Sequence, residues 1–185
     1  MKRVIVLVAL SLVLADRASV VAADIDYPLV GAPGVYTLVN LHPDEQRRRL
    51  YSVNYQQSGL IPVCSKVKIE SVSKRKMTFR LLDSDREYDY VFHDTLRDPI
   101  PKHLDKLFGP KCDATLAGLS EVDRKGIRAG TAMGGMTKRG VTLAIGYPPE
   151  HATPSLESDI WTYWMNRFGK MTVSFTDGKV TGISR

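Results

Sequence analysis

A chain of 185 residues in which 43% of positions are hydrophobic suits one or two small domains and excludes a large multidomain architecture. Its 26 Lys and Arg residues outnumber its 20 Asp and Glu residues, which gives a mild formal charge of +6. A charge of this size is typical of ordinary solubility, and the alternative is weak contact with an anionic membrane surface such as lipid headgroups.

Residues 1–23 have the layout of a cleavable signal peptide. Lys2 and Arg3 form a positive start, and residues 4–14 are apolar at all but one position. That run is too short to span a bilayer as a helix, and the small residues 21–23 precede a suitable cleavage point. A retained, buried or anchoring N-terminal helix is the alternative. The sequence therefore predicts a periplasmic or secreted protein.

Residues 24–113 are predicted to form a small β-rich domain. Apolar and polar side chains alternate in three successive segments, 67–72, 77–82 and 88–92, which polar turns separate. A period of two is that of a strand with one buried face. Three short strands at this spacing favour either a small SH3-like barrel or a twisted meander.

Other elements of this domain are less regular in sequence. Tyr36 begins one further strand, and residues 50–55 form another candidate. Leu104, Leu107 and Phe108 have helical spacing, which predicts a short helix that ends at Gly109 and the following proline.

The last fifty residues carry the clearest signals, beginning with a helix whose two ends are marked. Thr137 is a good N-cap, because its hydroxyl can accept a hydrogen bond from a backbone N–H of the first turn. Val141 and Ile145 lie on one apolar stripe. Gly146 fits the left-handed position after the helix, and Pro148 prevents continuation.

Strands are predicted after this helix. Trp161 and Tyr163 alternate with polar residues, and the same period recurs from residue 171 to residue 176. Asp177 and Gly178 form the dipeptide that a type I′ hairpin turn prefers, so residues 179–183 are the returning strand.

Residues 114–133 are predicted to hold an earlier helix of the same module. The segment is rich in small residues, and its glycines make it a poor helix by propensity, at about 1 kcal/mol per glycine relative to alanine. Together, residues 114–185 are expected to form a small α+β module.

This module resembles the SmpA/OmlA family, whose fold is that of the outer-membrane assembly factor BamE and of β-lactamase-inhibitor-like periplasmic proteins. The order and spacing of the motif carry the resemblance, rather than any single position. The matching residues are Gly135, Met136, Thr137, Val141, Gly146, Pro148, Trp161, Tyr163, Val173, Phe175, Asp177, Gly178 and Val180.

The resemblance implies two short helices packed on a three-stranded antiparallel sheet, in ααβββ order. The motif residues are structural, so the resemblance implies no catalytic residue. BamE itself is a lipoprotein, whereas the first cysteine of this chain is Cys64, far beyond the signal-like segment. The chain departs from the family there, and membrane tethering through a lipid is not expected.

The chain has two cysteines, Cys64 and Cys112. In an oxidising compartment an even number of cysteines usually pairs, which predicts a disulfide between them. Free or intermolecular thiols are the alternative. A loop of this length would stabilise the fold by about 3–4 kcal/mol on the chain-entropy account.

Motifs for catalysis, metals and cofactors are lacking in the sequence. The four histidines, His42, His93, His103 and His151, have no metal-ligand spacing, and each is expected to be a surface or capping residue. No nucleophile elbow, zinc-protease motif, phosphate loop or dinucleotide fingerprint occurs. We therefore expect no cofactor, no metal and no enzymatic activity.

A basic cluster at residues 68 and 74–76 is the one sequence feature that could suggest nucleic-acid binding. Export argues against that interpretation, and no aromatic residues are interleaved with the cluster. Nucleic acid is therefore not an expected partner.

Aromatic residues near the C-terminus are the best candidates for partner binding. On a strand, Trp164 points to the face opposite Trp161, and exposed tryptophan is enriched at interfaces. We therefore identify Tyr147, Trp164 and Phe168 as a candidate partner surface. The alternative is that the N-terminal half or the loop 147–158 covers Trp164.

The sequence thus predicts a non-enzymatic cell-envelope protein that acts as a protein-interaction or scaffold factor, with a role in outer-membrane protein assembly as the resemblance implies. The alternative is an inhibitor or binding protein for an exported enzyme. An enzyme with an unfamiliar site is a third hypothesis. The partner is expected to be an envelope protein.

Overall fold

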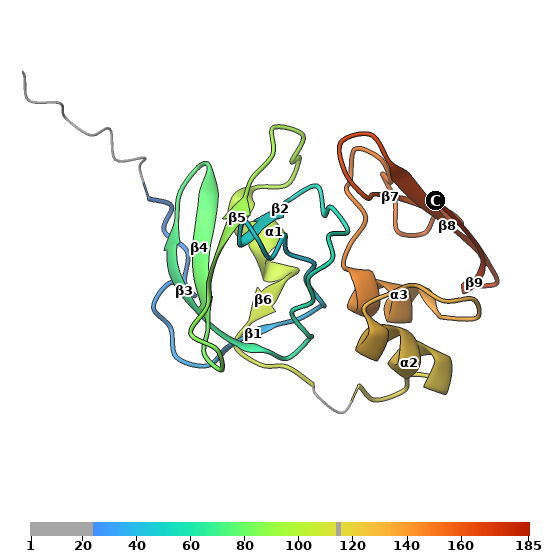
Figure 1. Cartoon of the computed structure of the whole chain (residues 1–185), viewed down its shortest axis with the longest axis horizontal. Helices are drawn as coiled ribbons and strands as arrows, with labels where there is room; N and C mark the ends of the chain where they lie inside the picture. The colour runs from blue at the N-terminus through green and yellow to red at the C-terminus, as the bar shows by residue number, and fades with distance from the viewer. Residues whose placement is uncertain (1–23, 114–115) are drawn as a thin grey trace, which may run out of the picture.

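The computed structural model describes residues 24–113 and 116–185, and it shows a mixed α+β protein built from two units (Figure 1). The N-terminal unit holds a six-stranded sheet and the C-terminal unit holds a three-stranded sheet. Each unit has its own hydrophobic cluster. The predicted signal peptide lies outside the described residues.

The six-stranded sheet has the strand order β2-β5-β4-β3-β1-β6. Its strands are β1 (Val35–Thr37), β2 (Arg49–Tyr51), β3 (Lys66–Val72), β4 (Lys76–Leu81), β5 (Glu87–Val91) and β6 (Phe108–Gly109). Neighbours are antiparallel except β2 and β5, which are parallel. The sheet curls, with β2 and β6 at its two ends (Figure 1). The three strands β3, β4 and β5 pair in chain order, as the sequence predicted, whereas β1, β2 and β6 add to the sheet out of chain order.

The short helix α1 (Ile100–Asp105) packs into the core of the curled sheet, where Leu104 is fully buried. The prediction of a helix continuing to Gly109 was wrong. Phe108 and Gly109 form β6 and pair with β1 instead. Phe108 is buried against Phe79, with ring centroids 5.4 Å apart, so its apolar contact belongs to the sheet rather than to a helix face.

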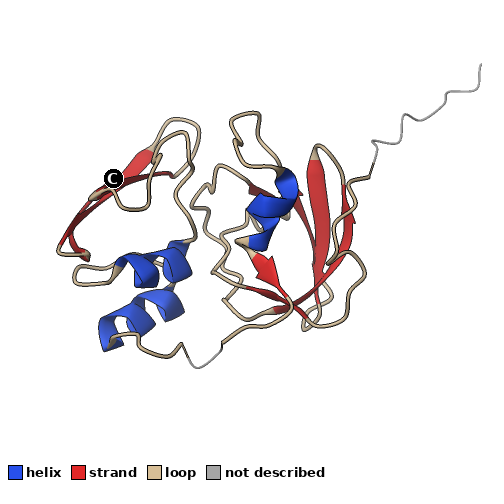
Figure 2. Ribbon diagram, turned by 180° about the vertical axis from the view of Figure 1, so that it is seen from behind, coloured by secondary structure: helices blue, strands red, loops and turns tan. Residues whose placement is uncertain are grey.

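The C-terminal unit has the expected order of two helices followed by three strands (Figure 1). Its elements are α2 (Glu121–Ala129), α3 (Lys138–Ile145), β7 (Ile160–Trp164), β8 (Lys170–Thr176) and β9 (Lys179–Ser184). The strands form an antiparallel sheet in chain order. Figure 2 shows α2 and α3 lying together against one side of this sheet.

Several local predictions for this unit are confirmed. Thr137 caps α3, accepting a hydrogen bond from the Gly140 N–H at 3.0 Å. Asp177 and Gly178 both have positive φ, 50° and 70°, as a type I′ turn requires. Trp161 is fully buried and meets Phe175 across the sheet, with ring centroids 4.8 Å apart.

The carboxylate of Asp123 joins the first turns of the two helices. One oxygen accepts hydrogen bonds from the backbone N–H and the hydroxyl of Ser120, which is the N-cap of α2. The other accepts from the backbone N–H and the hydroxyl of Thr137, the N-cap of α3. A negative charge near two helix N-termini is favourable, which explains how this fully buried carboxylate is accommodated.

Glycines at the helix crossing make room for these contacts. A Cβ atom at Gly140 would overlap the Asp123 carboxylate, and one at Gly126 would overlap the thioether of Met136. The low helix propensity of α2 is therefore the consequence of close packing, and the reciprocal Ser120–Asp123 capping box helps to offset it.

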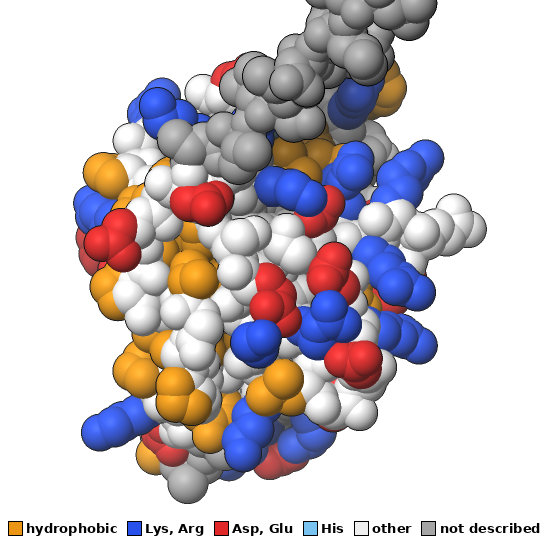
Figure 3. All heavy atoms as spheres, turned by 90° about the vertical axis from the view of Figure 1, so that its left-hand side faces the viewer, with side chains coloured by type: hydrophobic (Ala, Val, Ile, Leu, Met, Phe, Trp, Pro, Cys, Tyr) orange, Lys and Arg blue, Asp and Glu red, His pale blue; other side chains and the backbone are white. Residues whose placement is uncertain are grey.

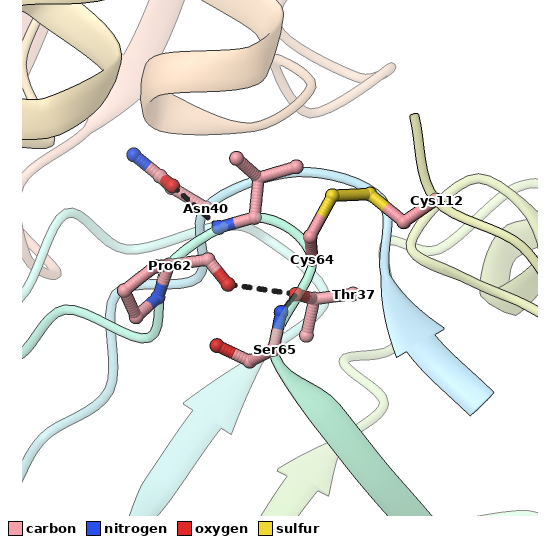
Figure 4. Close-up of a disulfide and its surroundings, with 7 residues drawn as sticks. Thr37, Asn40, Pro62, Cys64, Ser65 and Cys112 are labelled. Atoms are coloured by element: carbon pink, nitrogen blue, oxygen red, sulfur yellow. Dashed lines mark hydrogen bonds between the residues drawn. A yellow bond between two sulfur atoms is a disulfide. The ribbon is translucent and has the colours of Figure 1, made fainter. Parts of the chain in front are cut away.

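The predicted disulfide between Cys64 and Cys112 is present, with the two Cα atoms 5.4 Å apart (Figure 4). Cys64 lies on a tight turn that Thr37 holds in place. The Thr37 hydroxyl donates to the Pro62 carbonyl at 2.7 Å and accepts from the Ser65 N–H at 3.0 Å. The bond therefore ties the end of the N-terminal unit to a rigid turn.

Basic and acidic side chains are interspersed on the β3–β4 side of the molecule (Figure 3). Lys68 pairs with Glu70 at 3.0 Å, and Lys76 pairs with Asp89 at 2.8 Å. Two members of the basic cluster noted in the sequence thus have acidic partners.

Replacing Asp123 by Asn should lower the free energy of unfolding by about 2 kcal/mol. The amide has the same shape, but its NH₂ group would face the N–H and hydroxyl donors of one N-cap, which need an acceptor. Glu121→Gln is the matched control on the same helix. Glu121 forms only an exposed ion pair with Arg128, so this variant should stay within about 0.5 kcal/mol of the native protein. Urea unfolding measures both values, and equal stability of the two variants would contradict the capping role.

Candidate functional site

The two units meet at the C-terminal end of α3, where a helix leaves its last carbonyls without intrahelical partners. Side chains of the N-terminal unit supply the missing donors. The Asn54 amide donates to the carbonyls of Ile145 and Tyr147, both at 2.8 Å, and the Gln56 amide donates to Ile145 at 3.0 Å. Polar side chains of one unit therefore cap a helix of the other.

Asn40 lies at the centre of this interface and is 1% exposed. Its amide donates to the carbonyl of Ile127 at 2.7 Å and to that of Ala144 at 3.0 Å, so it contacts both helices. Its carbonyl oxygen accepts from the Val63 N–H at 2.8 Å, next to the disulfide (Figure 4). All polar groups of this buried side chain thus have partners.

His42 and Gly146 complete the contact. The His42 Nε2–H donates to the Ala144 carbonyl at 3.2 Å, so this histidine caps a helix but is buried rather than exposed. Gly146 has the positive φ expected after the helix, at 75°, but its ψ of −176° is extended rather than left-handed helical. A Cβ atom there would crowd the Asn54 amide at 2.8 Å.

A cleft with a cavity of about 360 Å³ lies along this interface. Both units line it, and the contributing segments come from far apart in the sequence. The aromatic and ionisable side chains of its lining include Tyr51, Tyr55, Tyr90, Arg97, His103, Lys106, Tyr147, Glu150 and His151. Ligand sites occur preferentially at such boundaries between domains.

An ion-pair network closes one side of the cleft. Lys106 contacts Asp98 at 2.5 Å and Glu150 at 2.8 Å, so it joins the N-terminal unit to the loop after α3. Lys102 adds a third contact to Asp98 at 2.8 Å. Hydrogen bonds from Lys102 and Lys106 hold the pKa of the Asp98 carboxyl well below its usual range.

Tyr90 and His103 form a hydrogen-bonded pair deeper in the cleft, with the hydroxyl 2.8 Å from Nε2. Burial raises the pKa of Tyr90 far above its usual value of 10, so the phenol stays protonated. Burial, assisted by the charge of Lys106, lowers the pKa of His103 to about 4, against the opposing effect of Asp98. The expectation of a surface or capping role for His103 was wrong.

The aromatic residues near the C-terminus have three different environments. Tyr147 lines the cleft, half-buried, with the Lys106 ammonium 6.0 Å from its ring centroid. Trp164 is half-buried, donates from Nε1 to His151 Nε2 at 3.2 Å and carries Lys170 over its ring at 4.8 Å. Phe168 lies on the β7–β8 hairpin tip and is 92% exposed.

Trp164 is thus partly covered and partly exposed: His151 of the loop 147–158 stacks on one part of its ring. Its own sheet face is not closed over, since Ile160 on the same face of β7 is 59% exposed. The cleft residues Arg97, His103 and Lys106 were not identified from the sequence. They lie in irregular segments and one short helix, and only the fold brings them together.

Within residues 24–113 and 116–185 no group of three or more His, Cys, Asp or Glu side chains could hold a metal ion. Both cysteines are in the disulfide. Among the helices of the described segments, none is long and apolar enough to cross a membrane.

Neither protein-family models, curated proteins nor solved structures show a match to this chain.

Replacing Asn40 by Ala should lower the free energy of unfolding by at least about 2 kcal/mol, because two carbonyls and one N–H lose their buried partner. Gln46→Ala, at an exposed turn position, is the control and should change stability by less than about 0.5 kcal/mol. Chemical denaturation measures both. If Asn40→Ala were as stable as the control, the polar interface would contribute nothing to holding the units together.

Stability should fall as the pH is lowered from about 6.5 to about 4. In this window the unfolded chain protonates His103 while the folded protein, with its pKa near 4, does not. The loss from His103 should reach up to about 3 kcal/mol and be complete near pH 4, because both states then carry that charge. Below pH 4 stability should fall further, because the unfolded chain protonates Asp98 before the folded protein does. Unfolding curves across this pH range measure it.

His103→Gln should make this pH dependence shallower, whereas His93→Gln, at an exposed position, should leave it unchanged. Some dependence should persist in His103→Gln, because burial also lowers the pKa of His42. Identical profiles for the two variants would exclude His103 as a source of the effect.

Proposed function

We propose that this chain is an exported, non-enzymatic protein of the cell envelope that binds a protein partner through its C-terminal unit. The observation that carries the proposal is the nearly complete exposure of Phe168, on the hairpin tip that follows the half-buried Trp164 in the chain. Aromatic side chains of this kind are the residues that most often supply binding energy at protein interfaces.

The hairpin tip that carries Phe168 is hydrogen-bonded in place. The Asn166 side chain accepts from the N–H groups of Phe168 at 2.9 Å and Gly169 at 2.8 Å. Gln57 of the N-terminal unit donates to the Met165 carbonyl at 3.1 Å. Because this loop is already ordered, little conformational entropy is lost when a partner binds the exposed aromatic residue on it.

The outer face of the three-stranded sheet extends this surface. Ile160, Thr162 and Trp164 alternate along that face of β7, and Thr172 and Ser174 continue it on β8. The charged member of this face is Lys170, which pairs with Trp164 across the strands and lies over its ring. The other side chains named here are uncharged, which suits the core of an interface. We name Ile160, Trp164 and Phe168 the aromatic face. Tyr147 lines the cleft and begins the loop whose His151 contacts Trp164, so it lies at the border of this face.

We interpret the C-terminal unit as a BamE-like module of the SmpA/OmlA type, and an outer-membrane assembly complex is the first candidate partner. The element order α2, α3, β7, β8, β9 and the hairpin at Asp177 and Gly178 support this interpretation. A disulfide suits a chain that folds in the oxidising periplasm after removal of residues 1–23.

The alternative is an inhibitor or binding protein for one exported enzyme. The projecting, hydrogen-bonded tip with Phe168 also suits insertion into the pocket of an enzyme. The identity of the captured protein separates the two: subunits of an assembly machinery support the first function, and a single soluble enzyme supports the second.

Phe168→Ala should reduce recovery of the partner from envelope extract at least tenfold, because truncation of a central interface aromatic typically costs about 2 kcal/mol or more. Its melting temperature should be unchanged, since the side chain is exposed. Leu82→Ala is the matched control, being an exposed apolar residue that is 51% accessible on the other unit. Equal recovery with Phe168→Ala and the native protein would exclude the aromatic face.

A further inference from the structure

Hydrogen bonds and an ion pair hold the walls of the interdomain cleft. Asn54 and Gln56 hold the C-terminal end of α3, and Lys106 holds Glu150 of the following loop. The cleft is therefore preformed, and a ligand would not have to order its walls. A volume of about 360 Å³ suits a small molecule.

Most polar groups around the cleft already have partners, and the exceptions indicate what the cleft can bind. The hydroxyls of Tyr51, Tyr55 and Tyr147 have no hydrogen-bond partner within the described part of the chain, and Arg97 forms no ion pair there. Tyr51 and Tyr55 meet edge to face, with ring centroids 5.3 Å apart. The available groups are thus aromatic surfaces, hydroxyls and one guanidinium.

His151 offers a further donor. Because the Trp164 N–H donates to its Nε2, this nitrogen carries no proton and the proton of the neutral ring lies on Nδ1. For Nδ1 no hydrogen-bond partner occurs among residues 24–113 and 116–185. The Nδ1–H group is therefore available to an acceptor from a ligand.

The permanent charges that act on His151 are those of Arg97 and Lys170, and both are positive. Partial burial lowers the pKa of His151, and His93, Arg97 and Lys170 each lower it further. The carboxylate nearest in sequence, Glu150, is already bound to Lys106. An anion at this side of the cleft would meet a favourable field and unpaired donors, whereas a cation would be repelled.

We propose that the interdomain cleft binds a small organic anion, a carboxylate attached to an apolar or aromatic body. The carboxylate lies against the Arg97 guanidinium and the His151 Nδ1–H, which are the donors that suit it. The body lies against the rings of Tyr55 and Tyr147. This site adjoins the aromatic face, because Trp164 donates to His151, but its ligand is a small molecule in the cleft rather than a protein on the sheet surface.

Titration of ¹⁵N-labelled mature protein with phenylacetate and with octanoate tests the proposal, the first with an aromatic body and the second with an aliphatic one. Both should give saturable shifts of amide resonances around Arg97, Gly146 and His151. Phenylacetamide, which has the same shape without the charge, should bind at least about tenfold more weakly, as loss of a charge-assisted pair predicts.

Arg97→Gln should weaken phenylacetate binding about tenfold, whereas Arg75→Gln should bind as the native protein does. Arg75 is the matched control, an exposed arginine on the β3–β4 turn outside the cleft. His151→Gln provides a second variant with a reduced affinity.

Three results would overturn the proposal. They are an absence of saturable shifts at the cleft with both carboxylates, equal affinity for phenylacetate and phenylacetamide, and equal affinity of Arg97→Gln and Arg75→Gln. The spectra of the variants also report folding, so a loss of binding is separated from a loss of structure.

Discussion

The side-chain amides that cap α3 are the constraint on which the arrangement of the molecule depends. The helix ends at Ile145 without a basic residue in its last turn, and Pro148 follows soon after. Its orphan carbonyls would be costly to bury without donors. Asn40 and Asn54 provide those donors from the other unit, so the satisfied helix end and the domain interface are the same contact.

The same constraint extends to the strands. The Gln56 N–H donates to the Trp164 carbonyl at 2.9 Å, where β7 ends, and Gln57 holds the first residue of the hairpin tip. One segment of the N-terminal unit therefore fixes the cleft, the end of β7 and the loop that presents Phe168. A polar interface of this kind fixes orientation, because hydrogen bonds are directional whereas apolar contacts are not.

Local signals in the sequence predicted much of the secondary structure. The period of two located β3, β4, β5, β7 and β8, the cap at Thr137 located α3, and the Asp-Gly pair located the last turn. The disulfide followed from the even number of cysteines. The strands, the helix and the turn depend on residues close together in the sequence. The disulfide could be inferred without knowing the fold, because only two cysteines are present to pair.

The site depends on contacts between distant residues, which explains why the sequence did not reveal it. Asn40 lies in an irregular segment and bonds to a residue 104 positions away, and nothing in its local sequence distinguishes it from a surface amide. Asp123 was missed for a similar reason, since its second partner, Thr137, belongs to another helix. Phe108 has helical spacing with Leu104, but pairing with β1 decides its conformation.

The disulfide has a consequence for the order in which the protein is completed. Both cysteines and all six strands of the larger sheet precede residue 113, so the strands and the disulfide of this unit involve no residue of the second one. Domains generally fold as they emerge, N-terminal first. During that interval water can occupy the donors of Asn40 and Asn54, and the arrival of α3 replaces it. In that order of folding, the first unit provides the donors against which the end of α3 docks.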